Sequence, residues 1–335
     1  MQKNKIKHPD KQISTDATQD IGRVGVVGLG LTGRGITACL LANGFAVTAC
    51  DRSPRRWEDA RSHVKTALGE LHRRELLAHS ATKRWQERFQ TVRDPSGMAG
   101  CGFVIESVDE DLRIKHQVFD RLEAALDHAA VIASNTSSIP ITLLQKGRAN
   151  PERFIGMHWG EPAEIMRYLE IIPGQFTSAK TVRRTRRLGE LCGKRPTVLQ
   201  RDIRGFISNR LMYAMFREAF YLLESGVAGM ETIDDSFRND IGWWAALAGP
   251  FRWMDLTGIP AYASVMEGLL PKLANTRSVP RTMKETVRSG ARGISNRRGF
   301  YRYTRKSAGE WQRAWTDFTY EMRGLVEKYE NRLQC

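Results

Sequence analysis

The chain has 335 residues, of which 41% are hydrophobic and 27% charged, proportions typical of a folded globular protein with room for two domains. No apolar stretch is long enough to span a bilayer, so we expect no membrane association. The net charge of +15 points to an anionic partner or simply to a basic surface. Nucleic acid is not the favoured partner, because the Lys and Arg residues are spread along the chain and form no nucleic-acid motif.

The first 22 residues are polar and lack the apolar segment of a secretory signal, so we expect residues 1–22 to be a disordered extension. The five cysteines are scattered, odd in number and without C-x-x-C spacing. This pattern predicts reduced thiols, a cytoplasmic location and no metal site.

A strand–turn–helix–strand unit is predicted over residues 23–51. Its turn has the pattern G-x-G-x-x-G, formed by Gly28, Gly30 and Gly33. In a dinucleotide site the first glycine permits the tight turn, and the second lets a pyrophosphate approach the backbone. The third lets the helix pack closely on the strand, and the helix N-terminus offers N–H groups to the phosphates. The alternative is a structural turn in another kind of α/β protein.

Asp51 ends the second strand of this unit, where its carboxylate can accept hydrogen bonds from an adenosine ribose. The same charge would repel a 2′-phosphate, which favours NAD over NADP. The 2′-phosphate could be accommodated by Arg52, Arg55 and Arg56. Because of the charge of Asp51, we nevertheless predict NAD. The other cofactor contacts expected here are Leu31, Thr32 and Arg52.

The rest of the chain divides into an α/β part and a helical part. We expect a helical hairpin inserted at about 54–90, helices over 112–128 and 180–192, and strands over 102–108, 131–135, 154–159, 168–172 and 196–200. No strand is predicted after Gly205. The fold class is therefore a Rossmann-type dinucleotide-binding domain (23–203) followed by an all-α domain (204–303). A C-terminal extension (304–335) carries apolar residues at helical spacing and is expected to dock on the core or on a partner subunit.

His158 and Glu170 are the candidate catalytic pair. Both lie in predicted strands and are equally distant from Glu164, so a symmetric hairpin would place their Cβ atoms about 5 Å apart. The carboxylate would then fix the imidazole tautomer and stabilise the imidazolium formed when His158 accepts a proton. The alternative is a surface pair without catalytic duty.

Two polar residues could orient a substrate. Ser137 follows a strand at the carboxyl edge of the sheet, where ligands bind in open α/β folds. Asn209 lies near the start of the helical domain. Taken alone, each is better explained as a cap or turn residue.

Dispersed segments of the chain resemble the L-3-hydroxyacyl-CoA dehydrogenase family. The similar blocks, in family order, are VGVVGLGLTGRGI, VIESVDEDLRIKHQVF, ASNTSSIPIT, RFIGMHW, MRYLEIIPG, RGFISNRLM, GPFRWMDLTG and GFYRY. The resemblance covers about residues 23–303. It implies NAD-dependent oxidation of an (S)-3-hydroxyacyl-CoA to the 3-oxoacyl-CoA, a reaction of fatty acid metabolism, in a homodimer formed through the helical domain.

The resemblance also assigns roles to residues. His158 is implied as general base with Glu170 as its partner, and Ser137 and Asn209 as substrate-orienting groups. Glu110 and Lys115, which otherwise read as solvated helix residues, are implied to contact NAD. The further candidates for contacts with the cofactor are Asp51, Asn135 and Glu161. The candidates for contacts with the phosphates of coenzyme A are Arg73 and Arg74.

The chain departs from the family pattern after the candidate base. The run His158-Trp159-Gly160-Glu161-Pro162 places Glu161 where an Asn is usual, and Trp243 and Trp244 stand where shorter side chains are common. The alternatives to a CoA ester are therefore a non-CoA 3-hydroxy acid, of the sugar acid or carnitine type, or a non-catalytic NAD-binding role.

Overall fold

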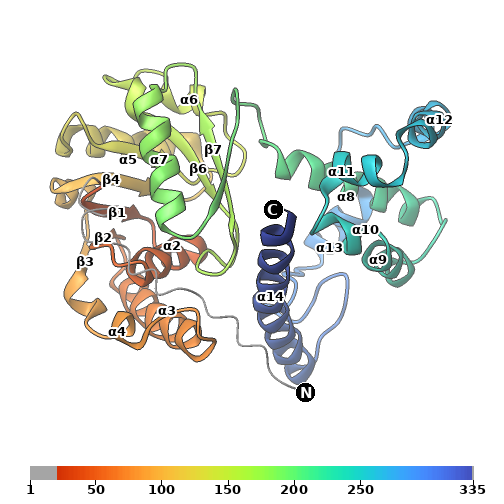
Figure 1. Cartoon of the computed structure of the whole chain (residues 1–335), viewed down its shortest axis with the longest axis horizontal. Coiled ribbons are helices and arrows are strands. Elements are labelled where there is room, and N and C mark those ends of the chain that lie inside the picture. The colour runs from red at the N-terminus through yellow and green to blue at the C-terminus, as the bar shows by residue number, and fades with distance from the viewer. Residues whose placement is uncertain (1–20, 334–335) are drawn as a thin grey trace. The chain divides into compact units, whose positions relative to one another are not determined.

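The computed structural model describes residues 21–333 and divides the chain into two compact units, Met1–Ile207 and Ser208–Cys335 (Figure 1). The predicted N-terminal extension lies outside the described residues except for its last two, of which Ile21 is buried. The division after Ile207 falls four residues beyond the predicted boundary at 203. Phe206, which is 1% exposed, and Ile207 belong to the first unit.

The first unit is built on one eight-stranded sheet with the order β3-β2-β1-β4-β5-β6-β7-β8. The strands are β1 (Arg23–Val27), β2 (Val47–Cys50), β3 (Phe89–Val92), β4 (Cys101–Glu106), β5 (Val131–Ser134), β6 (Phe154–Trp159), β7 (Tyr168–Pro173) and β8 (Arg195–Val198). Neighbouring strands are parallel except for the antiparallel pair β6–β7. The carboxyl ends of β1, β4, β5 and β6 therefore meet at one edge, where ligands bind in folds of this kind.

Helices pack against this sheet (Figure 1). They are α2 (Leu31–Ala42), α3 (Pro54–Arg73), α4 (His79–Thr82), α5 (Leu112–Ala125), α6 (Ile141–Gln145) and α7 (Ala179–Leu191). The apolar strands β1, β2 and β5 are almost wholly buried, as parallel strands covered on both faces should be. On α5 the predicted apolar face buries Val118 and Leu122, whereas Ile114 is 38% exposed.

The predicted insertion at 54–90 needs correction. It was expected to be a helical hairpin, but it contains one long helix, α3, followed only by the short α4 and a 3-10 turn over Trp85–Arg88. Its last two residues begin β3, an edge strand that pairs with β2 and that the sequence did not predict. β3 has only four residues, and only Phe89 is fully buried, so its hydrophobic signal is weak.

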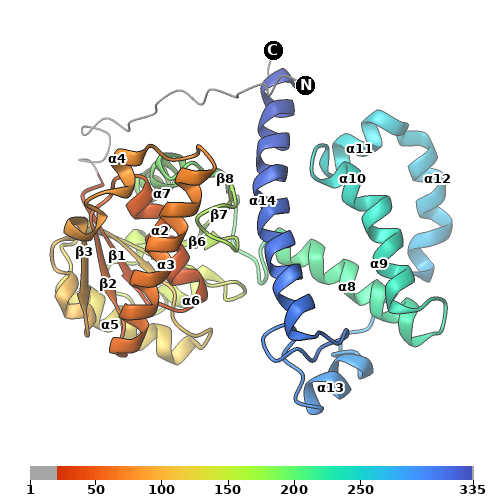
Figure 2. The same ribbon diagram turned by 90° about the horizontal axis from the view of Figure 1, so that it is seen from below.

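The second unit is helical, as predicted. It contains α8 (Ser208–Glu224), α9 (Met230–Asn239), α10 (Ile241–Ala245), α11 (Gly249–Thr257), α12 (Ile259–Leu269), α13 (Arg281–Arg288) and α14 (Arg305–Leu333). α14 is a single uninterrupted helix (Figure 2). Among residues 21–333, no helix is long and apolar enough to cross a membrane.

Candidate functional site

The glycine turn between β1 and α2 has the three-part geometry expected of a dinucleotide site. Gly28 has φ +93°, and a Cβ there would lie 2.5 Å from the carbonyl oxygen of Ser107. A Cβ on Gly33 would lie 1.9 Å from the carbonyl oxygen of Gly28, so only glycine lets the helix pack this closely. At Gly30 the nearest atom to such a Cβ is Nη1 of Arg56 at 3.5 Å, which leaves the backbone open to a phosphate.

Asp51 is held in place at the end of β2. One carboxylate oxygen accepts a hydrogen bond from the backbone N–H of Leu29 (3.0 Å), and the other accepts from the N–H of Ser53 (2.9 Å). These bonds fix the carboxylate between the glycine turn and α3 and leave further lone pairs for ribose hydroxyls. The structure therefore offers NAD the diphosphate turn and the ribose acceptor that the sequence predicts.

Lys115 is not the solvated helix residue that the sequence alone suggests. Its side chain is 1% exposed, and its Nζ donates to Oε1 of Glu106 at 2.8 Å. Glu106 is also buried, and its carboxylate accepts from the N–H of Val108 (2.7 Å) and the hydroxyl of Ser134 (2.6 Å). This buried ion pair joins α5 to the carboxyl ends of β4 and β5, directly beneath the edge where the cofactor turn lies.

Glu110 organises the turn that carries Ser137. Its Oε1 accepts from the hydroxyl of Thr136 (2.6 Å) and from the backbone N–H groups of Ser137 (3.0 Å) and Ser138 (2.9 Å). Desolvation pushes the pKa of Glu110 up, but hydrogen bonds from Thr136 and Ser138 and the charge of Lys115 outweigh it and hold the pKa below its ordinary value. The ionised carboxylate is therefore the form that this turn requires.

Asn135 connects the two neighbouring strand ends. Its side-chain oxygen accepts from the N–H of Trp159 (2.9 Å), and its amide group donates to the hydroxyl of Ser107 (3.2 Å). Ser107 in turn lies against Gly28. The glycine turn, Asn135 and the end of β6 are thus linked by direct contacts.

His158 and Glu170 face each other as predicted. They are register partners in the antiparallel pair β6–β7, and His158 Nδ1 lies 3.0 Å from Glu170 Oε2. Glu170 is 1% exposed and His158 9% exposed, so the pair does not lie on the surface of the first unit. The other oxygen of Glu170 accepts from the N–H of Ile207 (3.1 Å). The carboxylate is therefore buried and held at both oxygens.

The sequence reasoning missed a third member of this cluster, Tyr168. Its hydroxyl donates to Glu170 Oε2 (2.5 Å) and lies 3.0 Å from His158 Nδ1. The imidazole ring also packs on the rings of Tyr168 and Phe206, each with a centroid distance of 5.6 Å. Strand alternation could have revealed Tyr168, because residues two apart in β7 point to the same face of the sheet.

Glu161 lies against the start of α2. Desolvation and the neighbouring carboxylate of Glu164 raise the pKa of Glu161, while a hydrogen bond with Thr32 opposes that rise. Glu164 itself pairs with Nε2 of His63 on α3 at 3.2 Å. Two predicted cofactor residues, Thr32 and Glu161, are therefore brought together beside the glycine turn.

Three further predicted residues lie on other elements. Asn209 belongs to α8 in the second unit. Arg73 and Arg74 end α3, where both pair with Glu70; the Arg74 Nε to Glu70 Oε1 distance is 2.8 Å. Within residues 21–333, no group of three or more His, Cys, Asp or Glu side chains could hold a metal ion.

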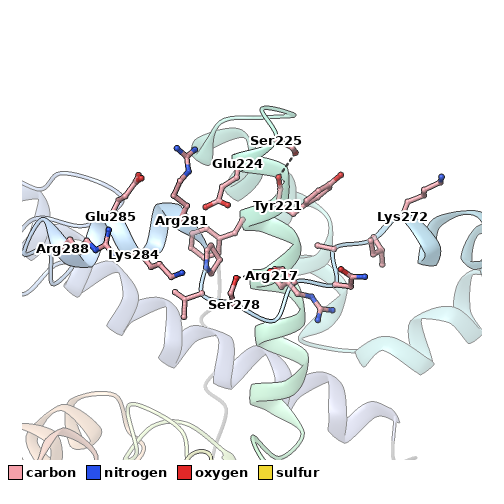
Figure 3. Close-up of a pocket in the computed structure, with 17 residues that line it drawn as sticks. Arg217, Tyr221, Glu224, Ser225, Lys272, Ser278, Arg281, Lys284, Glu285 and Arg288 are labelled. Carbon is pink, nitrogen blue, oxygen red and sulfur yellow. Dashed lines mark hydrogen bonds between the residues drawn. The ribbon is translucent and has the colours of Figure 1, made fainter.

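A cavity of about 720 Å³ lies wholly in the second unit, between α8, α13 and the segment over 272–280. It includes none of the predicted site residues. Its arginine and lysine side chains are exposed and point in different directions rather than toward a common centre (Figure 3). The candidate functional site is therefore the cluster at the carboxyl edge of the sheet.

Family models match most of the chain. The family model for the 3-hydroxyacyl-CoA dehydrogenase NAD-binding domain matches residues 23–203, and the model for the C-terminal domain matches residues 205–303. The cofactor is NAD, in agreement with the turn and Asp51.

Three curated relatives differ in what their names say they act on. A 5-formyl-3-hydroxy-2-methylpyridine 4-carboxylate 5-dehydrogenase of Mesorhizobium japonicum is 34% identical over 284 residues (85% of this chain, 91% of the relative). A probable 3-hydroxybutyryl-CoA dehydrogenase of Deinococcus radiodurans is 32% identical (84% of this chain, 100% of the relative). An L-carnitine dehydrogenase of Streptomyces coelicolor is 35% identical (72% of this chain, 74% of the relative).

A solved structure of an enzyme with the first of these activities, described as an NAD⁺-dependent dismutase, superimposes with a TM-score of 0.85 and 32% identity. The alignment covers 92% of this chain and 99% of the chain in the solved structure. The fold class and the family resemblance are both confirmed. The chain belongs to the 3-hydroxyacyl-CoA dehydrogenase family and is an NAD-dependent oxidoreductase that acts on a CH–OH group.

Proposed function

We propose that the protein oxidises the 3-hydroxyl group of an acyl substrate, with His158 as general base and Glu170 as its charge partner. The observation that carries this proposal is the buried pair itself, with Nδ1 and Oε2 separated by 3.0 Å. NAD supplies the oxidising power when bound. The contact chain from the glycine turn through Asn135 to Trp159 supports the assignment, because it joins the end of β6 to the cofactor turn.

The chemistry of the pair follows from proton positions. An ionised carboxylate can only accept hydrogen bonds, so the proton between the two groups belongs to Nδ1 of His158. Nε2 then carries the lone pair that takes the substrate hydroxyl proton as the carbonyl forms. The imidazolium that results is stabilised by Glu170, whose burial keeps that attraction strong.

The turn around Ser137 supports a substrate-orienting role. Glu110 ties the backbone of this turn in place, and a positioned hydroxyl at the carboxyl edge of the sheet can hydrogen-bond a substrate oxygen. Asn209 is proposed for the same task, on the family resemblance alone. Glu110, Lys115, Asn135 and Glu161 are proposed to shape the cofactor site, with Lys115 acting through its ion pair with Glu106 rather than as a solvated cation.

The first candidate substrate is a 3-hydroxyacyl-CoA ester. The family assignment and the net charge of +15 support it, since a positive field draws in a polyanion. The proposed phosphate contacts are Arg73, whose side chain is 70% exposed, and Arg74.

A second candidate is a small carboxylate without coenzyme A. One observation favours it: Arg73 and Arg74 are already paired with Glu70, which competes with a phosphate. The pyridine carboxylate and carnitine dehydrogenases among the relatives support it as well.

The test is a substrate panel at saturating NAD, followed by NADH absorbance. The panel holds 3-hydroxybutyryl-CoA and longer 3-hydroxyacyl-CoA esters, free 3-hydroxybutyrate, L-carnitine and a hydroxymethylpyridine carboxylate. His158→Gln should lower turnover of the accepted substrate by about 10²–10⁴-fold. Equal rates for the wild type and His158→Gln would refute the proposed base.

Charge reversal separates the two substrate classes. The double variant Arg73→Glu/Arg74→Glu should raise KM only for CoA esters if they are the substrates. An unchanged KM would favour the free carboxylate. A protein that binds NAD but turns over no member of the panel would instead support the non-catalytic alternative.

We also propose that the protein is a homodimer formed through its second unit. The structure describes every residue of helices α8 to α13, and none of these residues is buried in the single chain. Large apolar side chains there are strongly exposed: Trp243 is 78%, Phe251 80% and Leu256 67% exposed. A second copy would cover these faces. Light scattering should give about twice the 38.0 kDa chain mass, whereas a stable monomer would contradict the proposal.

The remaining proposal is a cytoplasmic location. Its support is that the four cysteines in the described part of the chain, Cys39, Cys50, Cys101 and Cys192, are buried and form no disulfide bond.

A further inference from the structure

An arginine side chain reaches from α3 to the glycine turn between β1 and α2. The atom nearest to a Cβ built on Gly30 is Nη1 of Arg56, at 3.5 Å. Gly30 is the residue directly before α2, and Arg56 lies in the first turn of α3, so this contact arises only in the folded unit. A cation therefore lies over the residue whose missing side chain lets a pyrophosphate approach the backbone.

The helical periodicity of α3 explains why Arg56 points toward the turn. Residues four apart lie on one face of an α-helix, and Ala60 and Val64, which follow Arg56 at this spacing, are both 0% exposed. Because α3 packs on α2, this buried face is the one turned toward the glycine turn. Arg56 continues the face at the N-terminal end of α3, where the helix becomes exposed.

The first turn of α3 is held in place by Asp51. The N–H of Ser53, the residue before the helix, donates to Asp51 Oδ1 at 2.9 Å, and Nε1 of Trp57 donates to the Asp51 carbonyl oxygen at 3.0 Å. The other carboxylate oxygen of Asp51 accepts from the N–H of Leu29 at 3.0 Å. The residue that offers an acceptor to the ribose thus also sets where Arg56 stands relative to the turn.

The guanidinium of Arg56 is not used by the fold. Within the described residues it forms no ion pair and no hydrogen bond, although Asp59 follows it at the (i, i+3) spacing that favours a pair. Asp51, which is also nearby, accepts from backbone N–H groups instead. The N–H donors of Arg56 are therefore open to an anion from outside the chain.

A guanidinium suits a diphosphate in both charge and shape. Each phosphate of the cofactor carries a negative charge, whereas the N–H groups of the turn and the N-terminus of α2 supply only partial positive charge. A guanidinium adds a full charge and can donate two parallel hydrogen bonds to phosphate oxygens. Its planar fork makes arginine more suitable than lysine for this contact.

We propose that Arg56 binds the diphosphate of NAD and covers the glycine turn from the α3 side. The residue beneath the guanidinium is Gly30, which favours the diphosphate over the 2′-phosphate of NADP as the group that Arg56 contacts. The inference needs only the cofactor. It does not depend on the substrate or on the proposed role of His158.

The test is calorimetric titration of the full-length protein with NAD⁺ and with ADP-ribose. Arg56→Met keeps a long apolar stem and removes the charge, so the dissociation constants of both ligands should rise by about tenfold. Arg56→Lys should recover part of the loss, because it keeps the charge but not the paired donors. Neither variant should change the melting temperature, since the guanidinium has no partner in the fold. Unchanged dissociation constants in Arg56→Met would overturn the inference.

Two further ligands identify the group that Arg56 contacts. Adenosine has no phosphate, so its dissociation constant, measured by NMR, should be the same in Arg56→Met and the wild type. An equal loss for adenosine and NAD⁺ would mean that the guanidinium stacks on the adenine ring, and the inference would be wrong. NADP⁺ should lose no more affinity than NAD⁺. A larger loss for NADP⁺ would assign Arg56 to the 2′-phosphate and would also overturn the inference.

Lys65→Met is the matched control for net charge. Lys65 is an exposed residue of the same helix, and its loss should leave the dissociation constant of NAD⁺ within about twofold of the wild-type value. Added salt should weaken NAD⁺ binding more steeply in the wild type and in Lys65→Met than in Arg56→Met, because a charge pair at the site is screened. Equal losses of affinity in the two variants, or equal salt dependence in all three proteins, would refute a direct contact.

The binding measurements need no substrate, so they remain decisive if the proposed reaction is wrong. If His158→Gln is inactive while Arg56→Met binds NAD⁺ as tightly as the wild type, the proposed function stands and the inference falls. If Arg56→Met binds weakly while His158→Gln keeps the wild-type rate, the inference stands and the proposed base falls.

Discussion

The three turn glycines should respond differently to the same added methyl group. A Cβ on Gly33 would lie 1.9 Å from the carbonyl oxygen of Gly28, whereas real Cβ atoms almost never approach closer than 3.0 Å. In Gly33→Ala, α2 must therefore move away from β1 by about 1 Å or more. Overpacking of this kind costs about 1–3 kcal/mol of unfolding free energy. For a unit of this size, that lowers the melting temperature by roughly 2–12 °C.

Gly30→Ala should fold normally and fail in binding. Its backbone conformation (φ −65°, ψ −162°) is open to any residue, and the nearest atom to the new methyl group is a flexible arginine nitrogen at 3.5 Å. The stability should stay within about 0.5 kcal/mol of the wild type. The methyl group would occupy the space where the pyrophosphate approaches, so the dissociation constant for NAD should rise by about tenfold or more, equivalent to about 1.4 kcal/mol.

Gly69→Ala is the matched control. Gly69 lies within α3 with no atom within 4 Å of an added Cβ, so alanine should stabilise the helix by about 0.5–1 kcal/mol and leave NAD binding unchanged. Calorimetric NAD titrations and thermal melts followed by circular dichroism measure both quantities. If Gly30→Ala binds NAD as tightly as the wild type, the turn does not contact the pyrophosphate. If Gly33→Ala melts like the wild type, the argument from close packing is wrong.

Three further predictions concern groups around the site. Lys115→Met leaves the buried carboxylate of Glu106 without its cation and should lower the unfolding free energy by about 3–5 kcal/mol in urea titrations; a loss near zero would show that the ion pair is not buried in solution. Desolvation raises the pKa of Glu110, but hydrogen bonds from Thr136 and Ser138 outweigh it and hold the pKa below 4.5. The ionised carboxylate therefore stabilises the fold above that pH, and this stabilisation is lost as the pH falls through the pKa of the folded state. The stability gap between the wild type and Glu110→Gln should therefore be full at pH 7 and close in acid, and a gap that is constant with pH would contradict this. Burial raises the pKa of Cys50 to about 12 and also raises that of Cys101, so Ellman's reagent should react with these thiols slowly in the native protein and fully after denaturation; rapid native reaction at both would argue against the packed core.

Local patterns were sufficient to predict much of the site. The glycine turn was predictable because three glycines at this spacing, directly after a buried strand, are typical of a dinucleotide-binding turn. The pairing of His158 with Glu170 follows from counting outward from the middle of a hairpin, because the register of two antiparallel strands is an arithmetic consequence of where they turn. Both features depend on residues close together in the chain.

Other features depended on packing between distant segments, and no local pattern reveals them. The edge strand β3 exists because β2 offers it a hydrogen-bonding partner, although its own apolar signal is weak. Lys115 looks like a surface residue until α5 packs on the sheet and buries it beside Glu106. Tyr168 joins the His158–Glu170 pair only because Gly160, directly after β6, leaves space for its ring. The amino-acid sequence by itself determined the cofactor turn and the pairing of His158 with Glu170. The tertiary structure decided which charged groups are buried, because burial is a property of the whole packed fold.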